Sequence, residues 1–526
     1  MKNTSALYKI LFFVLISNAA FSKNLYVATD GSNSNPGTIL FPMETINAAA
    51  ILTAPGDTVV IRKGLYKLST LIKPNSGTAG AYITYKSYQG DTVTIDGGVG
   101  YCMTFTAKQY ITLDGLIFTN QAMNTASAMI YMEQSDFIHV INCEFYGMQP
   151  DVGGENSSVI RCMGSGPTSF SDSCYFANNY FHDNLAPAMR LYDTKGWIIE
   201  NNKFVNCEQA IGGKDSPHDM IIRRNFIDGS KGIALMFAGQ DDTHNVTITE
   251  NIIVNCSLGF LLSGMGTYGK MRDGLHLYNN TFYNCQKAIG GWDDTYTTNY
   301  NFYNNIIYSD IAYNYGAGAD MPARILNVNK YSDVKNFDTA HYFIDYNCYN
   351  FPANEKGVWF AAGKGLMYSN LQSWTTATHF DKHSIVADPD FVFAGIMDFH
   401  LNNASKCIGA GKNGEDIGAY PRGNDGTIIG LLPLVKGNGV SVENVTRPTF
   451  QMYPIPFENG TLFIKGLGDQ SPAQIQIHDV QGKLIYQTHF AGSGVELDRS
   501  VIQNSGIYFL TVNGAAGKQT MKLVVQ

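Results

Sequence analysis

The sequence is poor in charge, poor in long apolar runs and lacks long helical patterns. Charged residues make up 15% of the 526 residues and the net charge is −8, which argues against nucleic acid or an anionic membrane as a partner. After the apolar run 10–16, no stretch is long and apolar enough to span a bilayer. Leucine-rich repeats need Leu at nearly every inward position, and helical repeats need ten or more residues at a 3.6-residue period. The sequence contains neither pattern, which excludes both classes.

The sequence does contain an internal repeat between Cys174 and Tyr308. Successive copies align on an anchor residue, with gaps of 23, 22, 27, 29 and 25 residues: Phe181, Phe204, Phe226, Ile253, Phe282 and Ile307. A polar doublet precedes each anchor: Asn178-Asn179, Asn201-Asn202, Arg223-Arg224, Glu250-Asn251, Asn279-Asn280 and Asn304-Asn305. This period, with short apolar runs between Asn, Gly and Asp, predicts a β-solenoid whose units bury their cores by stacking.

The column of Asn residues indicates the kind of solenoid. In turns that no sheet satisfies, an inward Asn can bond backbone groups of its own coil and of the next one. This pattern resembles the right-handed parallel β-helix, the fold of pectate lyases and many polysaccharide-degrading enzymes. The resemblance implies an all-β solenoid over residues 23–422.

The nine cysteines are an odd number and do not form an obvious disulfide framework. Cys207, Cys256 and Cys285 occupy one repeated position, so we interpret them as small buried apolar side chains. Cys162 and Cys174 flank an irregular loop and could pair; the sequence leaves this open.

Both ends of the solenoid carry segments of other kinds. Residues 1–22 have the basic start, apolar run and small-residue end of a secretory signal peptide. A helix-like segment over 45–52 is expected to cap the open end of the first coil. The repeat fails after Tyr308, where 309–345 is interpreted as a polar insertion, and 371–377 is expected to form a short helix.

Beyond an aperiodic Gly-rich linker at 423–446, residues 447–526 alternate as short strands. They resemble the C-terminal sorting domain of the type IX secretion system, which implies a small β-sandwich, contact with the secretion machinery, and a protein that is secreted or held at the cell surface. A small carbohydrate-binding sandwich is the alternative. We expect a monomer.

Five runs that follow the turns are candidates for the outer face, because alternation points their third and fifth residues outward. One expected row is Arg190, Gly212, Ala234, Leu261 and Gly290, and its neighbour is Tyr192, Lys214, Met236, Ser263 and Trp292. Coils stack at ~4.8 Å, so Lys214 is expected beside Tyr192. The small residues would leave room for a chain-like ligand, and Tyr192 and Trp292 offer rings for sugars.

Acidic residues border these rows, among them Asp215, Asp241 and Asp242. Carboxylates on loops can bind Ca2+, so these three are candidate metal ligands and Ca2+ is the one cofactor expected. Their spacing fits no fixed motif, and Asp is also favoured in turns for the bonds it makes to its own backbone.

Three further residues are candidates for substrate contact. Arg223 is either a cationic subsite for a uronate carboxylate or a partner of Glu250 on the next coil. His218 and His244 lie in adjoining loops and could titrate near neutrality, although loop histidines often have no such role.

The run Glu208–Phe226 resembles the lysine-bearing coil of β-helix polysaccharide lyases, notably the chondroitinase B and alginate lyase group. The resemblance implies that Lys214 is the catalytic base. In that group acidic metal ligands precede the lysine and an Arg follows one coil later. Here the ligands are reduced to Glu208, and residues 236–238 occupy the place of the Arg.

The leading hypothesis is therefore a lyase that cleaves an acidic, uronate-containing polysaccharide by β-elimination. Arg190, alternatively Arg223 or Ca2+, would stabilise the enolate, Lys214 would remove the proton and Tyr192 would protonate the leaving oxygen. One alternative is a glycoside hydrolase that uses Asp215, Asp241 and Asp242. Another is a non-catalytic surface protein that binds glycans along the aromatic row.

Overall fold

A computed structural model describes residues 22–98, 100–119, 128–149, 157–164, 169–238, 243–263, 271–292, 296–312, 323–328, 339–352, 358–362, 367–423, 429–430, 451–453, 457, 460–465, 473–479, 483–490, 494–514 and 517–525. The chain divides into two compact units, Met1–Val440 and Ser441–Gln526. Over the described ranges, no helix has the length and apolarity that crossing a membrane requires. The expected signal peptide falls outside these ranges and stays a prediction.

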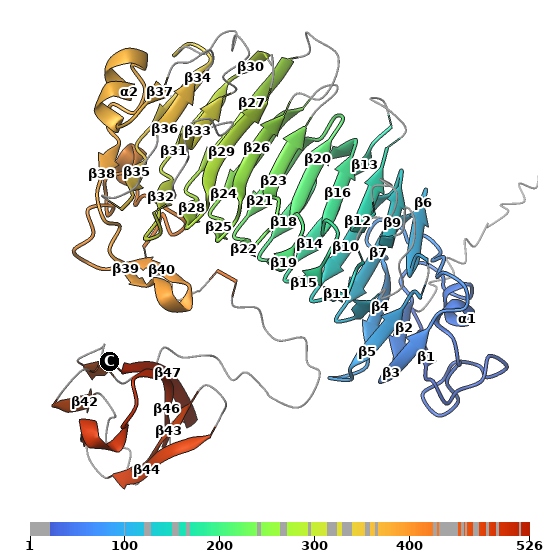
Figure 1. The fold of residues 1–526 in the computed structure, drawn as a ribbon. Coiled ribbons are helices and arrows are strands. Elements are labelled where there is room, and N and C mark those ends of the chain that lie inside the picture. The colour runs from blue at the N-terminus through green and yellow to red at the C-terminus, as the bar shows by residue number, and fades with distance from the viewer. Residues whose placement is uncertain are drawn as a thin grey trace, which may run out of the picture. The chain divides into compact units, whose positions relative to one another are not determined.

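The first unit is a parallel β-helix whose coils each contribute strands to three long sheets, named A, B and C (Figure 1). Sheet A contains, in spatial order, β1 (Asn24–Val27), β2 (Thr58–Ile61), β4 (Ile83–Ser87), β7 (Gln109–Asp114), β10 (Asp136–Ile141), β14 (Tyr175–Ala177), β18 (Ile198–Glu200), β21 (His218–Arg223), β24 (His244–Thr249), β27 (Met271–Tyr278), β31 (Tyr300–Tyr303) and β34 (Tyr342–Asp345), with β13 (Ser171–Asp172), β17 (Thr194–Lys195) and β30 (Tyr296–Thr298) at its side.

Sheet B contains β3 (Gly64–Lys67), β5 (Val93–Asp96), β8 (Ile117–Thr119), β11 (Glu144–Tyr146), β15 (Tyr180–Asn184), β19 (Lys203–Cys207), β22 (Phe226–Asp228), β25 (Ile252–Val254), β28 (Thr281–Tyr283), β32 (Ile306–Tyr308), β35 (Cys348–Asn350) and β38 (Ile385–Val386). Sheet C contains β6 (Met103–Thr106), β9 (Ala128–Glu133), β12 (Ser158–Met163), β16 (Met189–Tyr192), β20 (Ile211–Lys214), β23 (Ile233–Ala238), β26 (Leu258–Ser263), β29 (Lys287–Trp292), β33 (Ala323–Val328), β36 (Val358–Ala362) and β37 (Met367–Tyr368).

The turns between sheets A and B hold an unbroken row of buried asparagines, the Asn ladder. It consists of Asn179, Asn202, Asn225, Asn251, Asn280, Asn305 and Asn347, all fully buried. Each repeats the same bonds; Asn202 Nδ2, for example, donates to the carbonyl of Phe176 (2.9 Å) and to Oδ1 of Asn225 (3.0 Å). Its own Oδ1 accepts from the backbone N–H and from Nδ2 of Asn179, both at 2.9 Å.

The residue before each ladder position has a left-handed backbone, with φ of 54–58°. These residues are Asn178, Asn201, Arg224, Glu250, Asn279, Asn304 and Tyr346. Asn tolerates this conformation better than most residues, which explains the repeated Asn-Asn doublet. The column is therefore unbroken, and the predicted doublet Arg223-Arg224 is wrong, because the doublet in that coil is Arg224-Asn225.

The anchor of this coil is also one residue later than predicted. Phe204 pairs in register with Ile227, so Ile227 is the buried anchor of that coil. Phe226 instead lies on the outer side of sheet B, where it packs with Tyr420 and Ile429. Inside the solenoid the predicted anchors Phe181 and Phe204 stack with each other and with Phe145, with neighbouring ring centroids 4.7 and 4.8 Å apart.

Short helices stand at both ends of the solenoid (Figure 1). Helix α1 (Ile46–Ala50) contacts β1 and β2, as predicted for a cap, and the Thr45 side chain accepts from the Ala48 N–H at its start. Helix α2 (Leu371–Thr378) is also as predicted and buries Trp374. Asp381, just after α2, terminates the ladder by accepting from Asn347 Nδ2 (3.1 Å), Tyr349 (3.0 Å), Ser384 (2.6 Å) and Trp374 (2.8 Å).

Two predicted boundaries of the solenoid need correction. Residues 309–345 are not simply an insertion, because β33 and β34 within them continue sheets C and A by one more coil. The linker does not begin at 423 either. The Ile429 N–H donates to the Tyr420 hydroxyl at 3.0 Å, and Ile429 packs against the outer side of sheet B, so the solenoid unit includes this segment.

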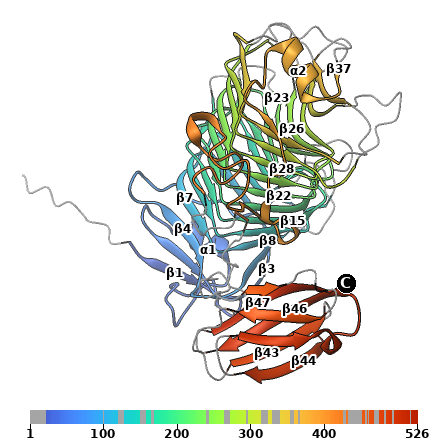
Figure 2. The ribbon, with the colours of Figure 1, turned by 90° about the vertical axis from the view of Figure 1, so that its left-hand side faces the viewer.

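The second unit consists, within its described residues, of two antiparallel sheets around one apolar core. One sheet contains β41 (Gln451–Tyr453), β42 (Thr461–Lys465) and β45 (Gly494–Asp498). The other sheet, whose strands Figure 2 shows side by side, contains β44 (Leu484–Phe490), β43 (Ala473–Asp479), β46 (Gly506–Gly514) and β47 (Gly517–Val525). Side chains such as Leu462, Ile477 and Leu510 fill the core between them, as expected for a small sandwich.

All nine cysteines fall within the described residues, and all are buried free thiols. Cys207, Cys256 and Cys285 are buried as predicted, and Cys162 and Cys174 do not pair. Burial raises the pKa of Cys207 to about 12, so this thiol stays protonated and behaves as a small apolar side chain.

We predict that Asn202→Leu destabilises the solenoid by on the order of 1–3 kcal/mol, because it leaves the Phe176 carbonyl and the Asn179 donors buried without partners. Denaturant titration measures the change. Asn206→Gly is the matched control, since Asn206 is exposed, has φ of 53° and bonds only at the surface. A neutral Asn202→Leu variant would show that the ladder bonds contribute nothing net.

A second prediction concerns the independence of the two units. Truncation after Val440 should leave the thermal unfolding of the solenoid unchanged, because the first unit is compact by itself and buries an apolar core of its own. Truncation after Arg422 should lower the unfolding temperature, since it removes Ile429 from the outer side of sheet B. Equal unfolding temperatures for the two truncations would contradict this account of the boundary.

Candidate functional site

The candidate site lies on the outer face of sheet C, where successive strands align side chains in rows. The first row runs Tyr131, Arg161, Arg190, Gly212, Met236, Leu261 and Gly290 through consecutive register pairs. The second begins with Tyr192 and Lys214, and the backbone register continues it through Ala238, Ser263 and Trp292. Tyr192 and Lys214 are therefore direct neighbours, as the sequence predicts.

Lys214 is the central cation of the second row. It is partly buried, and its Nζ lies 5.7 Å from the centre of the Tyr192 ring. Burial, together with the Arg190 guanidinium, lowers the pKa of Lys214, and the carboxylates of Asp215 and Glu208 oppose this shift only in part. A larger fraction of this amine is consequently neutral near physiological pH than for an ordinary lysine.

The pKa of Tyr192 is shifted in the opposite direction to that of Lys214. Only 9% of it is exposed, and its hydroxyl is buried without a hydrogen-bond partner among the described residues. Burial raises the pKa of Tyr192, and Arg190 and Arg161 oppose the rise. The phenol thus keeps its proton next to an amine that loses its own more readily, which is the arrangement that an acid and base pair requires.

Arg161 belongs to the site and was missed by the sequence reasoning. It pairs in register with Arg190, one coil nearer the N-terminus, so two guanidinium groups lie on neighbouring strands of one face. The signal was present, because Val159-Ile160-Arg161-Cys162 alternates like Ala188-Met189-Arg190-Leu191. Two adjacent guanidinium groups form a cationic surface suited to carboxylate groups.

The predicted rows are wrong for one coil. Met236, expected beside Lys214, pairs with Gly212, and Ala238 pairs with Lys214. Ala234, expected outside, is fully buried. Leu235 rather than Ile233 pairs with Ile211, so the whole strand is shifted by two residues from the expected register.

The small residues do not open a groove either. A Cβ at Gly212 would lie 3.0 Å from Oε1 of Gln209, whose side chain fills this space. The Leu258 and Leu261 side chains occupy the space at Gly290 in the same way. Gly212 therefore admits a buried amide next to the cationic row, instead of leaving an empty trough.

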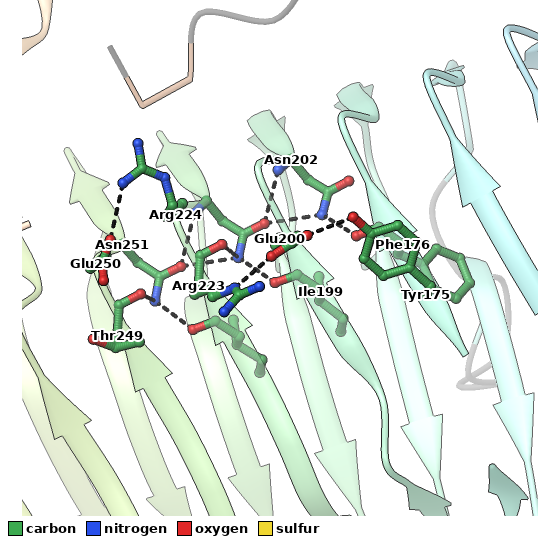
Figure 3. A network of polar contacts seen from close by, with 12 residues as sticks. Tyr175, Phe176, Ile199, Glu200, Asn202, Arg223, Arg224, Thr249, Glu250 and Asn251 are labelled. Atoms are coloured by element: carbon green, nitrogen blue, oxygen red, sulfur yellow. Dashed lines mark hydrogen bonds and ion pairs between the residues drawn. The ribbon is translucent and has the colours of Figure 1, made fainter. Parts of the chain in front are cut away.

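Arg223 is not part of this arrangement. It lies on sheet A, where its guanidinium bonds Glu200 Oε2 at 2.5 Å, and Glu200 also accepts from the Tyr175 hydroxyl (Figure 3). The predicted pair with Glu250 is wrong as well, because Arg224 makes that contact at 3.0 Å. Arg223 thus belongs to a surface ion pair on another sheet.

The remaining predicted residues have these positions. Asp215 follows Lys214 directly, whereas Asp241 and Asp242 lie outside the described residues. Trp292 ends β29, three strands from Lys214 on the same row, at about 14 Å for strands ~4.8 Å apart. His218 and His244 pair with each other in register on sheet A, and their rings stack at 4.5 Å.

The comparisons with known proteins agree with this architecture. Residues 25–162 match a family model described as a Pel9A-like, right-handed β-helix region, and residues 128–307 match the right-handed β-helix region model. The first unit is thus a right-handed parallel β-helix, as predicted. Residues 451–526 match the secretion system C-terminal sorting domain, which supports secretion or exposure at the cell surface.

Individual relatives are distant. An uncharacterized protein of Bacillus subtilis, YwoF, is 24% identical over 441 residues, which cover 72% of this chain and 90% of that protein. The pectate lyase PEL9 of Emericella nidulans is 35% identical over 86 residues, 16% of this chain and 21% of that enzyme. The crystal structure of pectate lyase Pel9A superposes with a TM-score of 0.47 and 16% identity, covering 76% of this chain and 96% of that structure.

Proposed function

We propose that this protein is a polysaccharide lyase that cleaves an acidic, uronate-containing polysaccharide by β-elimination. The observation that carries the proposal is the group formed by Lys214, Tyr192, Arg190 and Arg161 on adjacent strands of sheet C. It combines an amine of lowered pKa, a buried phenol of raised pKa and two guanidinium groups. The 86-residue likeness to a pectate lyase supports the same reaction class.

Each group has a defined task in the reaction. The proton to be removed lies α to a uronate carboxylate and is too weakly acidic to leave unless positive charge stabilises the developing enolate. Arg190 and Arg161 would bind the carboxylate and supply that charge. Neutral Lys214 would take the proton, and the electron pair would form the new carbon–carbon double bond as the glycosidic oxygen leaves. Tyr192 would protonate that oxygen, and solvent would then return the proton from Lys214 to the phenolate.

The pKa shifts favour this division of roles over the reverse. A base must be neutral before it can act, and burial next to Arg190 lowers the pKa of Lys214. An acid must keep its proton, and burial raises the pKa of Tyr192. Activity should therefore rise with pH through the pKa of Lys214 and fall at higher pH as Tyr192 ionises.

Ca2+ is proposed as an additional source of positive charge. Of its three candidate ligands only Asp215 is described, and among the described residues Asp215 belongs to no group of three or more possible metal ligands. A Ca2+ site would hence depend on Asp241 and Asp242. The roles of Lys214, Tyr192 and the two arginines stand without it.

The reaction class can be tested with purified protein. Incubation with pectate, alginate and glycosaminoglycans should raise the ultraviolet absorbance of unsaturated uronates, below the absorption band of the aromatic side chains, together with reducing ends, on at least one substrate. Parallel reactions with Ca2+ or with EDTA test the metal. Reducing ends without absorbance would indicate the hydrolase, and binding without either signal would indicate the non-catalytic glycan-binding protein.

We predict that Lys214→Ala lowers turnover by a factor of ~100 or more with unchanged stability, as loss of a general base typically does. Lys214→Arg should not restore it fully, because a guanidinium stays protonated. Tyr192→Phe should lower turnover more than binding, whereas Arg190→Ala and Arg161→Ala should weaken both.

Arg223→Ala is the matched control for the arginine variants, since Arg223 carries the same charge but bonds Glu200 on sheet A. Its kinetic constants should stay those of the wild type. If Lys214→Ala keeps wild-type activity while Asp241→Asn or Asp242→Asn abolishes it, the lyase assignment fails and the hydrolase replaces it.

A further inference from the structure

Two histidines and an aspartate meet where β21 and β24 begin on sheet A. His218 and His244 are register partners on consecutive coils, with ring centroids 4.5 Å apart and ring planes 20° apart. Asp219 follows His218 directly, and one possible ligand atom from each of the three residues lies within 4.8 Å of the others. This cluster has no part in the Lys214 chemistry proposed above.

The hydrogen bonding of His218 fixes which ring nitrogen can act as a ligand. Its Nδ1 lies 2.9 Å from the carbonyl oxygen of Ser216. A carbonyl only accepts, so Nδ1 carries the hydrogen and Nε2 holds the lone pair. An imidazole whose other nitrogen donates to a backbone carbonyl is the usual state of a histidine ligand, because this bond sets both the tautomer and the ring orientation.

The carboxylate of Asp219 also has a hydrogen-bond partner. Asn245 Nδ2 donates to Oδ1 of Asp219 at 2.7 Å, which orients the carboxylate and, among the described residues, engages one of its two oxygens. Asp219 and Asn245 both have a left-handed backbone, with φ of 54° and 50°, so the same local turn recurs on the two coils. The Phe170 and His218 rings are nearly perpendicular with centroids 4.5 Å apart, and only 7% of His218 is exposed.

We propose that His218, His244 and Asp219 bind one divalent transition-metal ion of the Zn2+ type. Two imidazoles and one carboxylate suit Zn2+, whereas Ca2+ prefers oxygen ligands throughout. Zn2+ bonds of about 2.0–2.1 Å bring tetrahedral ligands to about 3.4 Å from each other, so the three groups must close in on the ion. His244 and Asp219 are partly exposed and can make this movement. The bound ion would join two consecutive coils, because His218 and His244 belong to neighbouring turns of the solenoid.

The test is Zn2+ binding to the full chain without a polyhistidine tag. The protein is treated with EDTA, dialysed and titrated with Zn2+ in a calorimeter. The wild type should bind one equivalent, Ca2+ should not compete, and Zn2+ should raise the unfolding temperature. Co2+ in place of Zn2+ should give the visible absorption of a tetrahedral site.

Asp219→Asn is the variant that best separates metal binding from folding. Asn tolerates the left-handed backbone and its oxygen can still accept from Asn245, so the fold is kept while the ligand charge is lost. Asp219→Asn and His244→Gln should each lower the Zn2+ affinity at least about tenfold and abolish the shift in unfolding temperature. Their unfolding temperatures in EDTA should equal that of the wild type.

His276→Gln is the control, because His276 lies on the next strand of sheet A and its Nδ1 accepts from Asn301. This variant should bind Zn2+ like the wild type. A wild type that binds no stoichiometric Zn2+ would overturn the site, as would ligand variants that keep wild-type affinity. A loss on His276→Gln equal to that on Asp219→Asn would also overturn it, since the ion would then be held elsewhere.

Discussion

The hydrogen bonds of the Asn ladder are the constraint on which the rest of the solenoid depends. A stack of parallel coils leaves turn carbonyls and N–H groups that neither flanking sheet can pair, and buried unpaired groups are costly. Asn carries a donor and an acceptor on one short side chain, so it can satisfy its own coil and both neighbours. Asn202 and Asn225 make the same set of bonds one coil apart, and every coil from 179 to 347 is locked to the next in this way.

Locking the turns fixes the register of sheet C without requiring coils of equal length. Successive ladder residues are separated by 23 residues between Asn179 and Asn202, but by 29 between Asn251 and Asn280 and by 42 between Asn305 and Asn347. The extra residues lie outside the ladder turn. Lys214 therefore lies beside Tyr192, and Arg161 beside Arg190, although the coils that carry them differ in length.

The sequence was sufficient for the architecture because the ladder and the stacked aromatic anchors repeat residue types that few other folds need. It failed where two residues of one type compete for a position. Phe226 and Ile227 are both apolar, and only the register shows which of them points inward. Ile227 is the buried anchor, whereas Phe226 packs on the outer side of sheet B against Tyr420 and Ile429.

The candidate site was also predicted in part from the sequence. Tyr192, Lys214 and Arg190 follow from strand alternation within one run each, and the structure brings them together. Arg161 was missed because the search began one coil too late. Arg223 was misassigned because the doublet of its coil was set one residue too early, and its partner Glu200 follows only from the register of β18 and β21.

The ladder also has a direction. Besides its bond to a carbonyl of the preceding coil, each Nδ2 from Asn179 to Asn305 donates to the Oδ1 of the next ladder Asn. Every Oδ1–Nδ2 pair thus points the same way, so the amide dipoles add along the solenoid axis as peptide dipoles do along a helix. The positive end of this row meets the carboxylate of Asp381, which accepts from Asn347. Burial raises the pKa of Asp381, while the donors around it favour the charged form. The last coil thus ends in a buried carboxyl group that accepts hydrogen bonds and matches the polarity of the whole row, so the solenoid ends here in a polar acceptor rather than merely in a steric cap.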